Sequence, residues 1–180
     1  MLVLAAVIAM AACSKDTDPD QALKEGLAQQ QAGNTDAAAE QYQLVLDARP
    51  SDKYANYNLG VIEQADGRVQ LAEGYYRTAL DTDPNFVPAL FNLAILRTKA
   101  GASQEAIDLY LRVIDLQPDY AAAHFNLGIL YQGVGKAALG DQHINEALKL
   151  DPTLANRLAT SPVVPSATPA GAGATASATP

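Results

Sequence analysis

Residues 53–86 read KYANYNLGVIEQADGRVQLAEGYYRTALDTDPNF, and this stretch of 34 residues sets the pattern for most of the chain. Its proline, Pro84, belongs to a series with the same spacing that also contains Pro50, Pro118 and Pro152. Other residues recur at the same interval. A glycine stands 17 residues before each of these prolines, and a tyrosine stands 8 residues before the first three prolines. A period of this length, held without insertion, indicates a stack of similar structural units.

Each period contains two stretches with helical spacing. In residues 53–86 the turn Gly67-Arg68 separates them, and glycine can adopt the left-handed conformation that ends a helix. In the second stretch Ala72 and Tyr76 share one face. Proline then ends this second helix, since it lacks an amide hydrogen and disfavours helix in the residue before it. We expect a polar residue after each proline to cap the next helix, namely Ser51, Asn85, Asp119 and Thr153.

This pattern resembles the tetratricopeptide repeat (TPR), a unit of 34 residues with small, aromatic and proline residues at these offsets. The resemblance implies an all-α fold, a right-handed α-solenoid of four tandem helix–turn–helix repeats. It departs from the family pattern at Glu25 in the first copy and at Gly140 and Ile144 in the last, as expected for terminal repeats with a single neighbour. The repeats run over 19–52, 53–86, 87–120 and 121–154, and a partial capping helix completes a domain that ends at 160.

The segments outside the repeats have other compositions. Residues 1–12, MLVLAAVIAMAA, are apolar and uncharged, which is typical of a signal peptide and too short to span a bilayer. Met10-Ala11-Ala12-Cys13 resembles the bacterial lipobox, which implies a diacylglycerol thioether on Cys13 and a lipidated tether over 13–18. The alternative is a short buried helix with an inert cysteine. No Lys or Arg precedes the apolar run, which leaves open an upstream start. Residues 161–180 contain only small residues, prolines and two valines, so we expect a disordered tail.

Composition excludes several classes of function. The net charge is −8 and the basic residues are scattered, which argues against a nucleic-acid partner. The two histidines, His124 and His143, show no spacing to carboxylates that suggests a metal site, and we interpret both as packed or solvated. Gly133-Val134-Gly135-Lys136 lacks the first glycine and the hydroxyl residue of a phosphate loop. We therefore expect no catalytic residue, metal, cofactor or small-molecule substrate, and a protein that is not an enzyme.

The candidate site is the inner wall formed by the first helix of each repeat. Three series of residues recur there at the repeat interval: Tyr57, Phe91 and Phe125; Asn58, Asn92 and Asn126; Val61, Ile95 and Ile129. In the TPR family these positions line a concave groove for extended peptides, and an asparagine series can hold peptide backbone. The alternative role of the asparagines is to tie adjacent helices together. Only Arg97 and Lys99 are basic residues close by, so capture of an acidic chain terminus is not expected.

Together these features predict a membrane-anchored adaptor that binds a protein or peptide partner. The lipobox implies the extracytoplasmic face of a bacterial cell envelope, and TPR lipoproteins of this general kind serve envelope assemblies. The alternative is an accessory or regulatory subunit that uses the solenoid for self-association or for docking to an enzyme.

Overall fold

The computed structural model describes residues 18–160, and within this range the chain forms helices joined by short turns, with no strand. The all-helical fold expected from the repeat period is confirmed. The predictions of a signal peptide, of lipidation at Cys13 and of a disordered tail over 161–180 concern residues outside the described part. The helices are α1 (Pro19–Gln31), α2 (Thr35–Ala48), α3 (Lys53–Ala65), α4 (Val69–Thr82), α5 (Val87–Lys99), α6 (Ser103–Leu116), α7 (Ala121–Gly133), α8 (Ala137–Leu150), the 3₁₀ turn η1 (Pro152–Leu154) and α9 (Ala155–Thr160).

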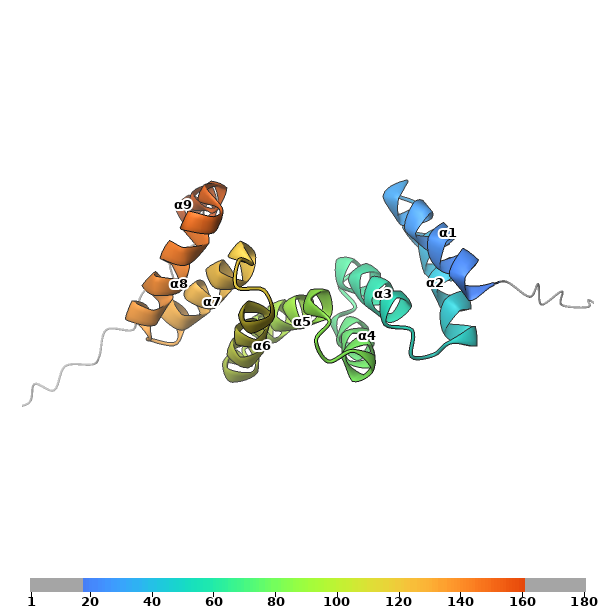
Figure 1. Cartoon of the computed structure of the whole chain (residues 1–180), viewed down its shortest axis with the longest axis horizontal. Coiled ribbons are helices and arrows are strands. Elements are labelled where there is room, and N and C mark those ends of the chain that lie inside the picture. The colour runs from blue at the N-terminus through green and yellow to red at the C-terminus, as the bar shows by residue number, and fades with distance from the viewer. Residues whose placement is uncertain (1–17, 161–180) are drawn as a thin grey trace, which may run out of the picture. The chain divides into compact units, whose positions relative to one another are not determined.

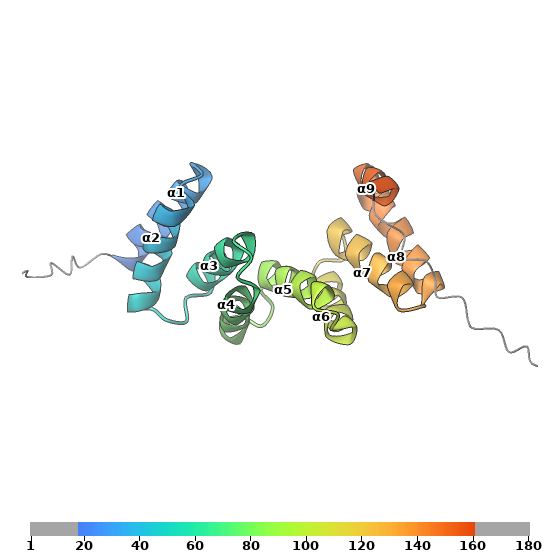
Figure 2. The ribbon, with the colours of Figure 1, turned by 180° about the vertical axis from the view of Figure 1, so that it is seen from behind.

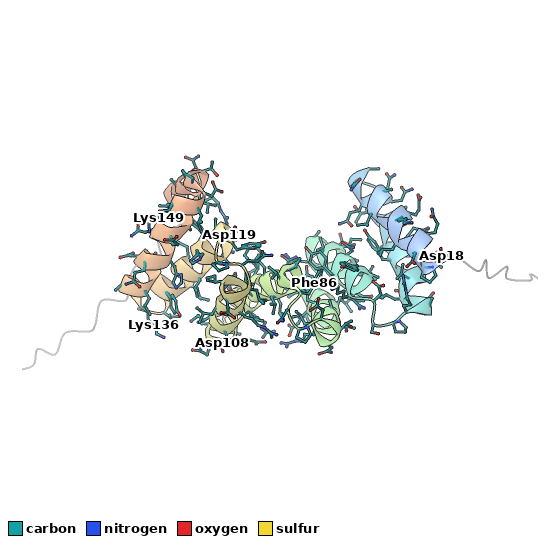
Figure 3. The ribbon with its side chains drawn as sticks, viewed as in Figure 1. Asp18, Phe86, Asp108, Asp119, Lys136 and Lys149 are labelled. Carbon is teal, nitrogen blue, oxygen red and sulfur yellow. The ribbon has the colours of Figure 1, made fainter. Side chains whose placement is uncertain are left out.

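The chain divides into two compact units, the first ending at Thr82 and the second beginning at Asp83. In the first unit α1 packs against α2, α2 against α3 and α3 against α4. In the second unit the same succession runs from α5 to α8. Figures 1 and 2, taken from opposite sides, show the two helices of each repeat paired as a hairpin. Charged side chains such as Asp108, Lys136 and Lys149 are exposed (Figure 3).

Glycine forms the turn inside every hairpin, as predicted. Gly33, Gly67, Gly101 and Gly135 have φ between 75° and 80°, and no other described residue has a positive φ. A side chain at this dihedral would clash with the backbone, so the repeated glycine follows directly from the tight turn.

A buried tyrosine joins the two helices of each of the first two hairpins. Tyr76 on α4 lies against Gly60 on α3, where an added Cβ would stand 2.6 Å from a ring carbon. Tyr42 on α2 faces Gly26 on α1 in the same way. The hydroxyl of Tyr42 donates a hydrogen bond to Gln30 Oε1 at 2.6 Å, and burial raises the pKa of Tyr42 to about 12. The glycine therefore leaves the space that the tyrosine ring fills, which lets the two helices of the hairpin pack closely.

The predicted helix caps after the prolines are wrong. The cap of α3 is Asp52, whose carboxylate accepts from the backbone N–H groups of Tyr54 and Ala55. Ser51 precedes this cap, because the chain makes a turn from Arg49 to Asp52 that has the proline at its second position and Ser51 at its third.

The same turn displaces the other predicted caps. Bonds from Phe86 N to Asp83 O and from Tyr120 N to Gln117 O close equivalent turns, so Asn85 and Asp119 do not cap α5 and α7. Thr153 lies inside η1, and Asp151 is the cap there. At the other end of the described residues α1 begins at Pro19, the first residue of the first repeat, and Asp18 caps it. No helix within 18–160 is long and apolar enough to cross a bilayer.

Candidate binding groove

A cavity of about 340 Å³ opens between α1 and α3 in the first unit. Its lining residues are Leu27, Gln30 and Gln31 from α1 and Tyr57, Asn58 and Val61 from α3. The three residues from α3 are those that the sequence predicts for the groove in the second repeat. No charged side chain lines the cavity, so its chemistry is amide and apolar.

Asn58 is the distinctive residue of this cavity. It is only 8% exposed, and its side-chain amide makes no hydrogen bond to any residue of the described chain. Because its polar atoms are not fully enclosed, solvent reaches them at the cavity, and a ligand can take the place of that water. Because a carboxamide both donates and accepts, Asn58 matches the N–H and C=O of a peptide group.

Apolar contact in the cavity comes from Tyr57 and Val61, both half-buried. The Tyr57 ring lies 6.0 Å from the ring of Tyr76, centroid to centroid, and is tilted by 38°. The buried Tyr76 therefore supports Tyr57 from behind, while part of the Tyr57 side chain stays open to solvent. A ring held in this way offers contact area at little entropic cost.

In the second unit the equivalent residues of the third repeat, Phe91, Asn92 and Ile95, are also half-buried. The ring of Phe91 meets the rings of Tyr110 at 5.9 Å and Tyr120 at 4.9 Å. The aromatic residue of the third repeat is thus also supported by neighbouring rings.

Phe125, in the fourth repeat, lies in the core and does not line an open surface. It is 2% exposed and clusters with Ala147 and Leu154, and Ile129 packs against the same cluster. Leu154 of the turn η1 and Leu158 of the short helix α9 cover the Phe125 ring. The guanidinium of Arg157, also on α9, stacks 4.9 Å from the centre of the ring. The sequence shows the stub after Pro152 but does not indicate that it would cover Phe125.

The asparagines of the series differ in their surroundings. Burial raises the pKa of Tyr110, which belongs to the preceding repeat, and Thr98 and Asn126 near its hydroxyl partly offset that rise. Asn126 thus lies close to a side chain of the neighbouring repeat, as in the alternative role of tying adjacent helices together. Among the basic residues near the predicted groove, Arg97 is paired with Glu105 at 3.0 Å.

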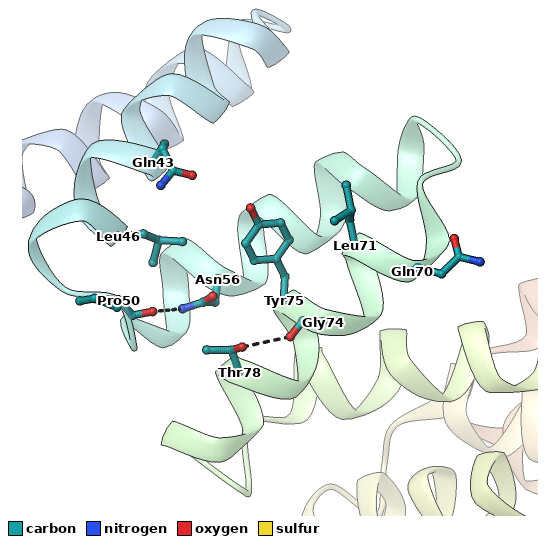
Figure 4. A pocket seen from close by; sticks show the side chains of 9 residues that line it. All are labelled: Gln43, Leu46, Pro50, Asn56, Gln70, Leu71, Gly74, Tyr75 and Thr78. Carbon is teal, nitrogen blue, oxygen red and sulfur yellow. Dashed lines mark hydrogen bonds between the residues drawn. The ribbon is translucent and has the colours of Figure 1, made fainter.

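A second cavity, which the sequence analysis missed, lies between α2 and α4 and measures about 460 Å³ (Figure 4). Leu46 contributes from α2, Asn56 from α3, and Leu71, Gly74 and Tyr75 from α4. In the sequence, the feature that could have indicated this cavity is Gly74, because glycine is disfavoured in the interior of a helix.

The two histidines also form a cluster that sequence spacing did not reveal. His124 on α7 and His143 on α8 bring their Nδ1 atoms to 3.0 Å, and His124 Nε2 lies 3.1 Å from the carbonyl oxygen of Pro118. Tyr131 stacks on His143 with centroids 5.7 Å apart. The two histidines are 19 residues apart in the sequence, and the packing of α7 against α8 brings them into contact. Within 18–160 there is no group of three or more side chains suited to a metal ion.

Comparison with known proteins agrees with the repeat geometry. Models described as tetratricopeptide repeat match residues 23–85 and 75–108, and one described as TPR repeat matches residues 96–135. Among curated proteins no sequence matches significantly.

Several solved structures share the fold. A crystal structure of MamA is 21% identical with a TM-score of 0.69, covering 77% of this chain and 81% of MamA. MamA from Desulfovibrio magneticus RS-1 is 20% identical, with a TM-score of 0.66 and coverages of 76% and 77%. PilF from Pseudomonas aeruginosa is 26% identical, with a TM-score of 0.66, over 74% of this chain and 61% of PilF.

Proposed function

The chain belongs to the tetratricopeptide repeat family of protein-interaction scaffolds, and from this premise we propose that the cavity between α1 and α3 binds an extended, uncharged peptide segment of a partner protein. The fold is typically a non-enzymatic interaction module that presents its repeats as a binding surface.

The observation that carries the proposal is the side-chain amide of Asn58, which lines that cavity, is only 8% exposed and has no hydrogen-bond partner among the described residues. A peptide group placed against it would satisfy both its donor and its acceptor. Tyr57, Val61 and Leu27 would contact apolar side chains of the segment, and Leu27 is 41% exposed in the free protein. Since no charged residue lines the cavity, a charged segment would lose hydration without gaining an ion pair.

A photocrosslinking amino acid at position 61 tests the proposal in cells. We expect the substituted Val61 to crosslink one partner protein, with the crosslink confined to a short uncharged segment. The matched control is the same substitution at Val69, a valine of the same unit that does not line the cavity. Equal crosslinking from both positions would contradict the proposal. Crosslinking of the chain to a second copy of itself would favour self-association instead.

We further propose that Cys13 carries a lipid that anchors the groove at a membrane of the cell envelope. This rests on the lipobox-like Met10-Ala11-Ala12-Cys13 and the preceding apolar run. More than one acyl chain gives stable anchoring where a single chain does not. Cys13→Ser should move the protein from the membrane fraction to the soluble fraction after cell lysis. Retention of that variant in the membrane would count against lipidation.

A further inference from the structure

The cavity between α2 and α4 is a second recess in the first unit, built from residues other than those of the groove between α1 and α3. Its volume of about 460 Å³ lies in the range of ligand sites. Figure 4 shows Leu46 on α2 and Leu71 and Tyr75 on α4 around it, with Asn56 at the start of α3. Leu71 is 53% exposed, the largest value among the exposed large apolar side chains of the described residues.

Asn56 places a hydrogen-bond acceptor in this apolar recess. The residue is 2% exposed, and its Nδ2 donates to the carbonyl oxygens of Pro50 at 3.0 Å and Asp52 at 2.9 Å. Because carbonyl oxygens only accept, these two bonds fix the orientation of the amide. Its Oδ1 is then left without a partner among the described residues, while the side chain lines the cavity. The oxygen is not fully enclosed, so an N–H or O–H donor that enters the recess can replace the solvent there.

Gly74 gives independent support for an occupant. It lies in the interior of α4, where glycine is a poor helix former, and nothing lies within 4 Å of the Cβ that another residue would carry. Packing within the chain therefore does not require this glycine, unlike Gly60. The other repeats have Glu40, Asp108 and Gln142 at the same position. Glycine removes the side chain that would close the recess, and it permits close approach of another backbone.

We propose that this recess is a second peptide-binding site, which takes one apolar side chain of an uncharged partner segment and a backbone N–H next to it. The apolar side chain packs between Leu46, Leu71 and Tyr75, the segment's backbone passes over Gly74, and its N–H donates to Asn56 Oδ1. No charged residue lines the recess, which excludes a charged anchor. The scaffold then has two faces for partners, and this second site does not depend on the groove between α1 and α3.

A defined probe tests the site. The capped peptide acetyl-Gly-Leu-Gly-amide is titrated into the full chain, and backbone and asparagine side-chain amide shifts are followed by NMR. We expect shifts at Gly74, Tyr75 and the Asn56 side chain. The analogue methylated at every backbone nitrogen keeps the leucine side chain and loses the donors, so it should bind about tenfold more weakly.

Gly74→Leu is the blocking variant, because its side chain enters the empty recess without a clash and improves helix propensity. It should abolish the probe-induced shifts. Gly133→Leu is the matched control, a helical glycine that also has open space around it and lies outside the recess. Three results would each overturn the proposal: no shift at the recess up to about 50 mM probe, unchanged binding by Gly74→Leu, or equal binding of the methylated analogue. Amide shifts at the recess that change with protein concentration in the absence of the probe would show that a second copy of the chain binds there. That result would also overturn the proposal.

Discussion

His124 and His143 face each other across the last hairpin, with their Nδ1 atoms 3.0 Å apart. The carbonyl of Pro118, 3.1 Å from His124 Nε2, determines the tautomers. A carbonyl only accepts, so His124 Nε2 carries a proton, and in the tautomer pair with both rings neutral its Nδ1 accepts from the Nδ1–H of His143. The pair thereby joins α7 to α8.

This pair predicts that the protein loses stability in mild acid. Burial, and to a smaller extent His124, lowers the pKa of His143. The unfolded chain then takes up a proton at higher pH than the folded chain, so the stabilisation is complete above the unfolded pKa of about 6.5 and is lost as pH falls below it. The nearby carboxylate is Glu146, whose pKa is lowered mainly by its ion pair with Lys149 and to a smaller extent by His124. Urea unfolding at about pH 7.5 and about pH 5.5 should give a lower midpoint at the acid value.

His124→Asn is the matched variant for the acid effect. Asn56 occupies the same repeat position in the second hairpin and donates to the carbonyl of Pro50, so asparagine can replace the bond to Pro118. The variant lacks the second imidazole that lowers the pKa of His143. Its unfolding midpoint should therefore change less between the two pH values. A pH dependence equal to that of the unmodified protein would show that other groups cause it.

Two glycines should respond in opposite directions to the same substitution. Gly60→Ala places a Cβ 2.6 Å from the buried Tyr76 ring, and overpacking of this kind costs about 1–3 kcal/mol. Gly74→Ala meets open space and should stabilise the helix by about 0.5–1 kcal/mol. Denaturant midpoints of the two variants test this directly. Destabilisation by Gly74→Ala would mean that this glycine has a structural role within the chain.

Phe125 should behave as a core residue and Tyr57 as a surface residue. Phe125→Ala removes a buried ring beneath η1 and α9 and should cost about 3–5 kcal/mol. Tyr57→Ala removes a half-buried ring and should cost clearly less. Unfolding free energies from chemical denaturation measure both. Equal costs would place Tyr57 in the core and remove it from the candidate groove.

The repeat period was enough to predict the helical hairpins, because each recurring residue has a local physical cause. Gly67 is required by a positive φ, and Gly60 by the Tyr76 ring. The caps of α3, α5 and α7 lie one position later than expected, because the turn at each proline includes the residue that was expected to cap the helix. Asp52 is therefore the cap where Ser51 was expected.

Features that depend on neighbouring elements could not be predicted in the same way. A period makes Tyr57 and Phe125 equivalent, but only Phe125 is followed by a terminal helix that covers it. It makes Asn58 and Asn126 equivalent, although Asn126 lies near the Tyr110 hydroxyl and the side chain of Asn58 makes no hydrogen bond to a described residue. These differences arise from packing between helices, which a spacing rule does not contain.

We propose that Asn58 serves a ligand and not the fold, and the variant Asn58→Leu separates these two roles. The measurement is the affinity of the segment captured by crosslinking from position 61, followed by fluorescence anisotropy, together with the unfolding midpoint of the same variant. We expect binding to weaken about tenfold or more and the midpoint not to fall, since the side-chain amide has no hydrogen-bond partner in the chain to lose. Unchanged affinity, or a lowered midpoint with binding intact, would contradict it.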